Sequence, residues 1–279
     1  MVSSHEVSQN LGEQPKRPIN KKVEQRMSEL CMSDTHAHLC DPSFDGDLEL
    51  VLLRAREAGV QRVLAVSENP AEAEKTLSLA KRFGEMVRPS VGLFPTNLDF
   101  EMLEQVRALV ERGAWSAIGE VGLDFWKVQD EEGRAVQQAI FSSLVELAIS
   151  HELVVNVHSR SCGRQTLELL LEKGAQRVQM HAFDAKASTA MLGVEAGYFF
   201  SIPPSVLRSP QKQKLVARLP VEALLLESDS PVLGAQPGER NEPSQIVLAL
   251  RAIAELKQLR PEALAEQLEA NAERLYRWA

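Results

Sequence analysis

The sequence predicts an α/β protein folded as a single (β/α)8 barrel domain, with an extra helix at its C-terminal end. Eight short apolar runs alternate with longer segments whose apolar residues recur at helical spacing. Such alternation is typical of parallel strands joined by crossover helices. The chain has 279 residues, which suits a barrel of this kind because these domains take roughly 250.

Eight strands are expected, each a short apolar run. In chain order they cover residues 30–36, 60–66, 87–93, 116–120, 153–158, 178–181, 198–201 and 224–227. An open, doubly wound sheet is the competing fold, and it predicts a glycine-rich phosphate loop after the first strand. The chain reads Asp-Thr-His-Ala-His at residues 34–38 instead, so the barrel is favoured.

Amphipathic segments follow the strands. Apolar residues recur at helical spacing in residues 48–55, 103–110, 140–148 and 167–171. A helix at 246–259 completes the eighth unit, and the extra helix is expected at 261–278. Pro261 suits the first turn of that helix because proline lacks a backbone N–H. Residues 30–279 are therefore expected to form the barrel domain.

Residues 1–29 differ from the barrel in composition. They are polar, contain Pro15 and Pro18 and show no sustained apolar period, which is typical of a flexible polar N-terminal tail. The sequence contains neither an apolar signal-peptide core nor a run of the ~18 apolar residues that a membrane span needs. We therefore expect an intracellular protein, cytoplasmic or nuclear, without membrane association.

Net charge and cysteine content narrow the classes of function. A net charge of −8 argues against a broad basic surface clamped on duplex DNA, although it permits a grip on one or two phosphates. The three cysteines, Cys31, Cys40 and Cys162, lack C-x-x-C spacing. Neither a disulfide framework nor a cysteine zinc site is indicated.

Six potential metal ligands fall at or just beyond the expected strand ends: His36, His38, Glu120, His158, His181 and Asp229. The C-terminal strand ends of a (β/α)8 barrel meet at one mouth, where active sites form. His36 and His38 are two residues apart, so on a strand they project from the same face. A buried carboxylate without a partner is costly, and a metal ion removes that cost. The pattern predicts a metal centre.

The number of ligands favours two divalent ions. A single zinc ion usually takes three or four protein ligands, fewer than the six available. Two ions sharing one carboxylate fit the count, and Glu120, central among the ligand strands, is the expected bridge. Such a pair, typically ~3.5–4 Å apart, clamps a phosphoryl or carbonyl group and lowers the pKa of a water between the ions. We expect Zn²⁺, with Mn²⁺ and Mg²⁺ as alternatives.

Five blocks of the sequence, in order, resemble the signature blocks of the TatD DNase family. They cover residues 34–39, 119–125, 157–160, 181–183 and 226–231. The resemblance extends from about residue 32 to the end of the chain, and residues 196–205 are similar to a vertebrate-type subgroup. It implies a metal-dependent (β/α)8 hydrolase, a deoxyribonuclease with 3′–5′ exonuclease activity, whose partner is DNA, single-stranded or at 3′ ends. No protein partner is implied, and a monomer is expected.

The resemblance also implies a role for each ligand. One metal would be held by His36, His38, Glu120 and Asp229, and the other by Glu120, His158 and His181. Glu120 and Asp229 are the expected catalytic residues. Asp229 would also orient or deprotonate the water that attacks the phosphodiester.

Other residues near these blocks are candidates for supporting roles. Arg160, two residues beyond a ligand, suits a substrate phosphate, with a structural salt bridge as the alternative. Asp34 shares the strand face of the histidines and is expected to support them from behind. Trp126 could stack on a base or simply pack. Phe94 and Asp184 stand where many relatives have other residues, so substrate contacts near them are expected to differ.

Two other functions are considered for the same set of residues. A binuclear amidohydrolase acting on a small cyclic amide, N-acyl or lactone substrate would use the same His-x-His start. Many such enzymes bridge their metals with a carboxylated lysine, whereas Glu120 takes that place here. A catalytically silent binding protein is disfavoured because all six ligands are present.

Overall fold

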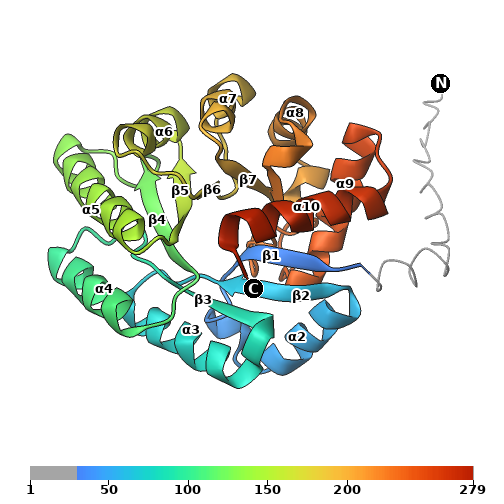
Figure 1. Ribbon diagram of the computed structural model, residues 1–279, viewed down its shortest axis with the longest axis horizontal. Helices are drawn as coiled ribbons and strands as arrows, with labels where there is room; N and C mark the ends of the chain where they lie inside the picture. The colour runs from blue at the N-terminus through green and yellow to red at the C-terminus, as the bar shows by residue number, and fades with distance from the viewer. Residues whose placement is uncertain (1–29, 279) are drawn as a thin grey trace, which may run out of the picture.

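Eight parallel strands form the barrel that the sequence predicts (Figure 1). The computed structural model describes residues 30–278. The strands pair in chain order and are β1 Met32–Ala37, β2 Val60–Ala65, β3 Val87–Val91, β4 Ala117–Asp124, β5 Val154–Arg160, β6 Val178–Met180, β7 Phe199–Ile202 and β8 Leu224–Leu226. Thr35 Oγ1 of β1 donates to the carbonyl of Leu226 in β8 at 2.8 Å. The two edges of the sheet therefore come together.

Helices surround the barrel, and all but the last two link successive strands. They are α2 Leu48–Glu57, α3 Pro70–Phe83, α4 Phe100–Arg112, α5 Glu131–Ser150, α6 Gly163–Glu172, α7 Ala187–Glu195, α8 Pro210–Arg218, α9 Ile246–Lys257 and α10 Pro261–Tyr276. In α4, Asp99 caps the first turn by accepting the N–H of Glu101 at 2.7 Å. Leu103, Val106 and Val110 lie buried on one face of this helix. The helical periodicity read from the sequence is therefore confirmed.

Strands β4 and β5 are longer than expected, so the prediction that Glu120 and His158 end their strands is wrong. β4 continues to Asp124 and β5 to Arg160, because the two strands keep pairing from Gly122 with His158 to Asp124 with Arg160. Gly122 permits this approach. Its φ is 148°, and a Cβ there would lie 2.0 Å from the carbonyl oxygen of His158.

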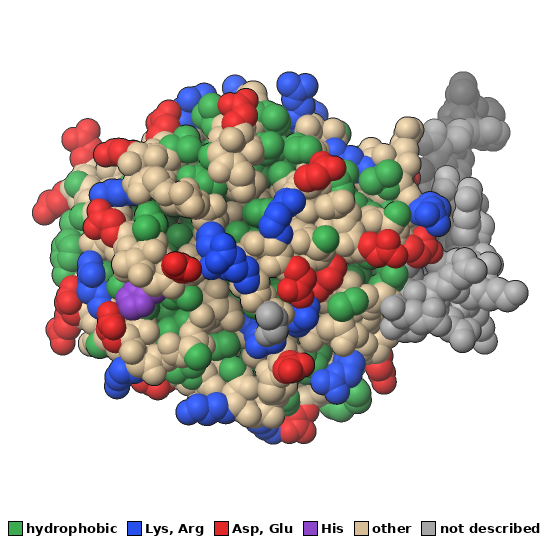
Figure 2. Space-filling model, in the orientation of Figure 1, with side chains coloured by type: hydrophobic (Ala, Val, Ile, Leu, Met, Phe, Trp, Pro, Cys, Tyr) green, Lys and Arg blue, Asp and Glu red, His purple; other side chains and the backbone are tan. Residues whose placement is uncertain are grey.

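Helix α10 lies across the N-terminal ends of the strands, at the end of the barrel opposite the predicted site (Figure 1). Ser33, near the start of β1, donates to Glu269 of α10 at 3.0 Å, and Asn271 of α10 donates to the carbonyl of Leu224 at 2.8 Å. Figure 2 shows acidic and basic side chains interspersed over the face of the molecule that carries α10.

One residue of α10 reaches into the polar interior of the barrel. The buried Tyr276 hydroxyl donates to Gln179 Oε1 at 2.6 Å and accepts from Asn156 Nδ2 at 3.1 Å. Asn156 Oδ1 lies 2.7 Å from His36 Nδ1. Hydrogen bonds therefore connect α10 to a predicted metal ligand.

The expected tail, residues 1–29, lies outside the described residues. Between residues 30 and 278, none of the helices combines the length and apolar character needed to cross a membrane.

Candidate metal centre

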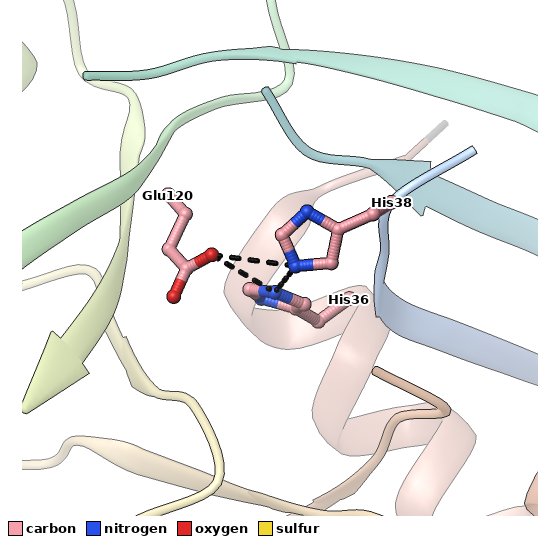
Figure 3. Close-up of side chains that lie close together, drawn as sticks. All are labelled: His36, His38 and Glu120. Carbon is pink, nitrogen blue, oxygen red and sulfur yellow. Dashed lines mark hydrogen bonds and ion pairs between the residues drawn. The ribbon is translucent and has the colours of Figure 1, made fainter. Parts of the chain in front are cut away.

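The six predicted ligands surround one centre at the C-terminal ends of the strands. They are His36 in β1, His38 just after it, Glu120 in β4, His158 in β5, His181 after β6 and Asp229 after β8. The rings of His36 and His38 point toward Glu120 (Figure 3), and their Nε2 atoms lie 3.6 and 3.4 Å from its Oε2. Asp229 Oδ1 lies 3.6 and 3.4 Å from the same two nitrogens. These four side chains form the first candidate ligand set, and the ligand atoms of His36, Asp229 and His181 also lie within 4.8 Å of one another.

The other oxygen of Glu120 faces a second ligand set. Glu120 Oε1 lies 2.6 Å from His158 Nδ1 and 3.7 Å from His181 Nε2. The ligand atoms of these three residues all lie within 4.8 Å of one another. One carboxylate therefore faces both sets, which is the geometry that a bridging ligand needs.

Each imidazole is oriented by a partner on its other nitrogen. His36 Nδ1 lies 2.7 Å from Asn156 Oδ1, and His181 Nδ1 lies 3.0 Å from Glu227 Oε2. The ring of His158 is reversed, with Nε2 3.1 Å from Asp124 Oδ2 and Nδ1 facing the centre. His38 Nδ1 lies 3.5 Å from Glu68 Oε1. Such partners fix which nitrogen can bind a metal.

These four partners, Asn156, Glu227, Asp124 and Glu68, were not predicted from the sequence. A signal existed for three of them. Asn156 lies two residues before His158 on the same strand, while Asp124 and Glu227 fall inside the sequence blocks quoted above. Only Glu68 lacks such a signal, because it comes from the loop after β2.

The residues fit a bound cation. Glu120 Oε2 is buried and forms no hydrogen bond with any of residues 30–278. A carboxylate oxygen in that position is costly unless an ion or a donor meets it. Imidazole nitrogens together with carboxylate oxygens suit Zn²⁺ and Mn²⁺.

The buried carboxylates and imidazoles of the centre alter one another's pKa values. Burial opposes ionisation of Glu120, but the hydrogen bond with His158 and the surrounding imidazoles hold the pKa of Glu120 well below its ordinary value. Burial likewise opposes protonation of His36 and His158, but neighbouring carboxylates raise the pKa of each to about 9. Because a metal binds the neutral imidazole, metal binding at this centre would release protons.

Asp34 lies behind the predicted ligands and bonds to backbone N–H groups beside them. Its Oδ1 accepts the backbone N–H of His36 at 3.2 Å and of Ser228 at 2.8 Å, so it connects the end of β1 to the segment after β8. Burial raises the pKa of Asp34 to about 7. The side chain holds the backbones that carry His36 and Asp229.

A cavity of about 490 Å³ opens above the centre. Its lining includes the predicted ligands Glu120, His158, His181 and Asp229 and the predicted phosphate-binding residue Arg160. It also includes Phe94 and Asp184, near which the substrate contacts are expected to differ from those of relatives, and Lys212, Val232 and Leu233. Lys212, at the start of α8, was not anticipated. It is 8% exposed and donates to the carbonyl of Ala182 at 3.0 Å, and burial lowers its pKa.

Fold and site together define a class of protein. A (β/α)8 barrel that gathers four imidazoles and two carboxylates beneath one cavity is the architecture of a metal-dependent hydrolase. A family model described as TatD related DNase matches residues 33–277. The chain therefore belongs to the TatD related DNase family, as the sequence blocks implied.

Similar proteins include a human protein named Deoxyribonuclease TATDN3, which is 42% identical over 256 residues, covering 87% of this chain and 93% of that protein. The match confirms the resemblance to a vertebrate-type subgroup. A Bacillus subtilis protein named as the metal-dependent hydrolase YabD is 30% identical, covering 88% of this chain and 98% of that protein. The crystal structure of YjjV from Escherichia coli, a TatD homologue, superposes with a TM-score of 0.82 at 27% identity, covering 88% of this chain and 98% of that chain.

Proposed function

We propose that this enzyme is a two-metal phosphodiesterase that hydrolyses DNA as a 3′–5′ exonuclease. The observation that carries the proposal is the position of Glu120. Its two oxygens face two different ligand sets, directly beneath the cavity. The deoxyribonuclease name of the human relative supports a DNA substrate.

Different side chains would serve different parts of such a reaction. Two bound divalent ions would lower the pKa of a water molecule and offset negative charge on the phosphate. Asp229 is suited to accept the proton of that water. Burial opposes its ionisation, but the nearby imidazole of His181 and a hydrogen bond with His38 lower the pKa of Asp229, which favours the ionised carboxylate. Arg160 and Lys212 supply positive charge in the cavity wall for a phosphodiester.

We propose that a single chain holds the complete metal centre. All six ligands come from a single chain, so a monomer can hold both ions. We propose Zn²⁺ as the ion, since four of the six ligands are imidazoles, with Mn²⁺ and Mg²⁺ as alternatives. We also propose that the enzyme works in the cytoplasm or nucleus.

The decisive experiment measures substrate class and metal content together. Metal-loaded protein is incubated with single-stranded oligonucleotides labelled at the 5′ end or at the 3′ end, and separately with N-acyl and lactone substrates. We expect a ladder of shortened products from the 5′ label, immediate release of the 3′ label, and close to two equivalents of metal per chain. Asp229→Asn is the control for contaminating nucleases and should give no ladder.

Two results would overturn the proposal. Turnover of the amide or lactone with intact DNA would assign the enzyme to the amidohydrolase alternative. Saturation at one equivalent of metal, with full nuclease activity, would refute the two-metal arrangement while leaving the DNA substrate in place.

A further inference from the structure

An exposed tryptophan stands beside the cavity. Trp126, in the loop after β4, is 50% exposed, whereas Trp115 and Trp278 are 8% and 5% exposed. The guanidinium carbon of Arg160 lies 3.8 Å from the centre of the Trp126 ring, and Lys127 Nζ lies 5.0 Å from it. The indole therefore lies in water, next to a cation that lines the cavity.

The backbone of Trp126 is fixed to the metal centre through one carboxylate. Asp124 Oδ1 accepts the N–H of Trp126 at 3.0 Å and the N–H of Lys127 at 2.8 Å. The other oxygen, Oδ2, lies 3.1 Å from Nε2 of the ligand His158. The N–H of Phe125 also donates to the carbonyl of Arg160 at 3.1 Å. The position of the indole is therefore set by the same group that orients a ligand.

The guanidinium group of Arg160 lies over the Trp126 ring, and its N–H groups have no hydrogen-bond acceptor among residues 30–278. It is exposed and lines the cavity, and its guanidinium forms no hydrogen bond or ion pair with any residue in the described range. The alternative of a structural salt bridge is thus not realised among residues 30–278. An arginine plane can stack on an aromatic ring while its N–H groups bind a phosphate.

We propose that Trp126 and Arg160 form a nucleotide subsite, in which the indole stacks on an unpaired nucleobase next to the cleaved phosphodiester and Arg160 binds a phosphate of the same strand. This inference rests on the proposed nuclease function and narrows its substrate. Both faces of a base inside a duplex are covered by its neighbours, so only a single strand or a frayed end can use this subsite. Stacking on an aromatic side chain tolerates any sequence, because every base has a π face.

Binding is tested without cleavage. Metal-loaded protein is titrated with a short single-stranded oligonucleotide carrying phosphorothioate linkages and with a blunt duplex of the same sequence, while tryptophan fluorescence is recorded. Trp126 is the exposed one of the three tryptophans, so the single strand should quench the emission and the duplex should not. Trp126→Leu should abolish the quenching and weaken single-strand binding on the order of tenfold.

Substitutions of Trp126 and Arg160 distinguish a stacking contact with a base from a general packing role. Trp126→Phe keeps an aromatic face and should retain most of the affinity, whereas Arg160→Gln should weaken binding with metal content unchanged. Arg164→Gln is the matched control, because Arg164 is an exposed cation on α6 that pairs with Glu168 outside the cavity. Leu259→Ala, which removes another exposed apolar side chain, should have no effect on binding.

The outcomes distinguish this subsite from the proposed function. If the wild-type protein cleaves oligonucleotides but Trp126→Leu binds and cleaves single strands and duplexes as the wild type does, the subsite is refuted and the nuclease remains. If the wild-type protein neither binds nor cleaves DNA, both fail. A fall in metal content in step with activity for Arg160→Gln would make Arg160 structural and refute its phosphate contact.

Discussion

The two oxygens of Glu120 have different neighbours. Oε2 lies near His36 and His38, which also approach Asp229, while Oε1 lies near His158 and His181. Each imidazole lies nearer one oxygen of this carboxylate, although His181 is also within reach of His36 and Asp229. Loss of one imidazole should therefore affect one ion, and loss of Glu120 should affect both.

Substitution of single ligands tests this division. His36→Ala and His158→Ala should each weaken mainly one metal site. Glu120→Ala should weaken both, because it removes the shared ligand and leaves two cations to repel each other. Titration of each variant with Zn²⁺ or Mn²⁺ by calorimetry measures both sites. Should Glu120→Ala keep one tight site while His36→Ala loses both, the bridge must be another residue.

The sequence alone could predict the candidate ligands but not their partners. Histidines and acids at the ends of successive strands stand out in the sequence because the barrel brings those ends together. Asn156, Asp124 and Glu227 were missed because their role depends on which ring nitrogen faces the centre. That choice is made by packing and hydrogen bonds between strands, as the reversed ring of His158 illustrates.

At the scale of elements, α10 contributes to the site from the far end of the barrel. Tyr276 bonds to Asn156, which holds His36, and to Gln179. Gln179 Nε2 in turn donates to Ser201 Oγ at 2.8 Å, and Ser201 Oγ donates at 2.6 Å to Glu227, the partner of His181. One hydroxyl is thus connected to a ligand of each set.

Removal of that hydroxyl should weaken metal binding. Tyr276→Phe leaves two buried amides short of a partner, which should cost about 1–3 kcal/mol of stability. Metal affinity should fall by up to about tenfold, since the orientation of His36 and His181 loosens. Thermal unfolding and metal titration measure the two effects.

Tyr198→Phe is the matched control for this substitution. Tyr198 is also buried, but its hydroxyl donates to the carbonyl of Ala175 at 3.0 Å and is not hydrogen-bonded to a candidate ligand or its partner in the described part of the chain. It should lose stability without losing metal affinity. Equal metal affinity in both variants would show that the network is purely structural.

Element type was easier to predict than element length. All eight strands and the extra helix lie where the apolar pattern placed them, because their buried faces determine that pattern. The ends of β4 and β5 differ because strand length depends on how far two neighbours continue to pair, here through the close approach at Gly122. No pattern within one strand contains that information.

At the scale of the whole molecule, acidic side chains gather around the metal centre. Seven carboxyl groups lie at the centre, behind its ligands or in the cavity wall: Asp34, Glu68, Glu120, Asp124, Asp184, Glu227 and Asp229. Arg160 and Lys212 are the basic side chains in the lining of the described cavity. Like charges gathered in this way repel one another, and bound cations reduce that repulsion.

Metal removal should therefore lower the stability of the whole barrel. An ion present at 100 times its Kd adds about 2.7 kcal/mol to the free energy of unfolding, which corresponds to about 5–10 °C in Tm for a domain of this size. Unfolding curves with and without a chelator measure the change. Glu120→Ala should show a much smaller response, and an unchanged Tm for the wild-type protein would contradict a tightly held metal.

The hydrogen bonds of the Tyr276 hydroxyl join residues that are synthesised at very different times. A ribosome releases His36 first, then Asn156 and Gln179, and Tyr276 only after every strand of the barrel. Until α10 emerges, the growing chain can form its sheet, but the amides behind His36 and His181 lack their common partner. We therefore expect the metal centre to gain its full rigidity only at the end of synthesis, and tight metal uptake to follow translation of the barrel.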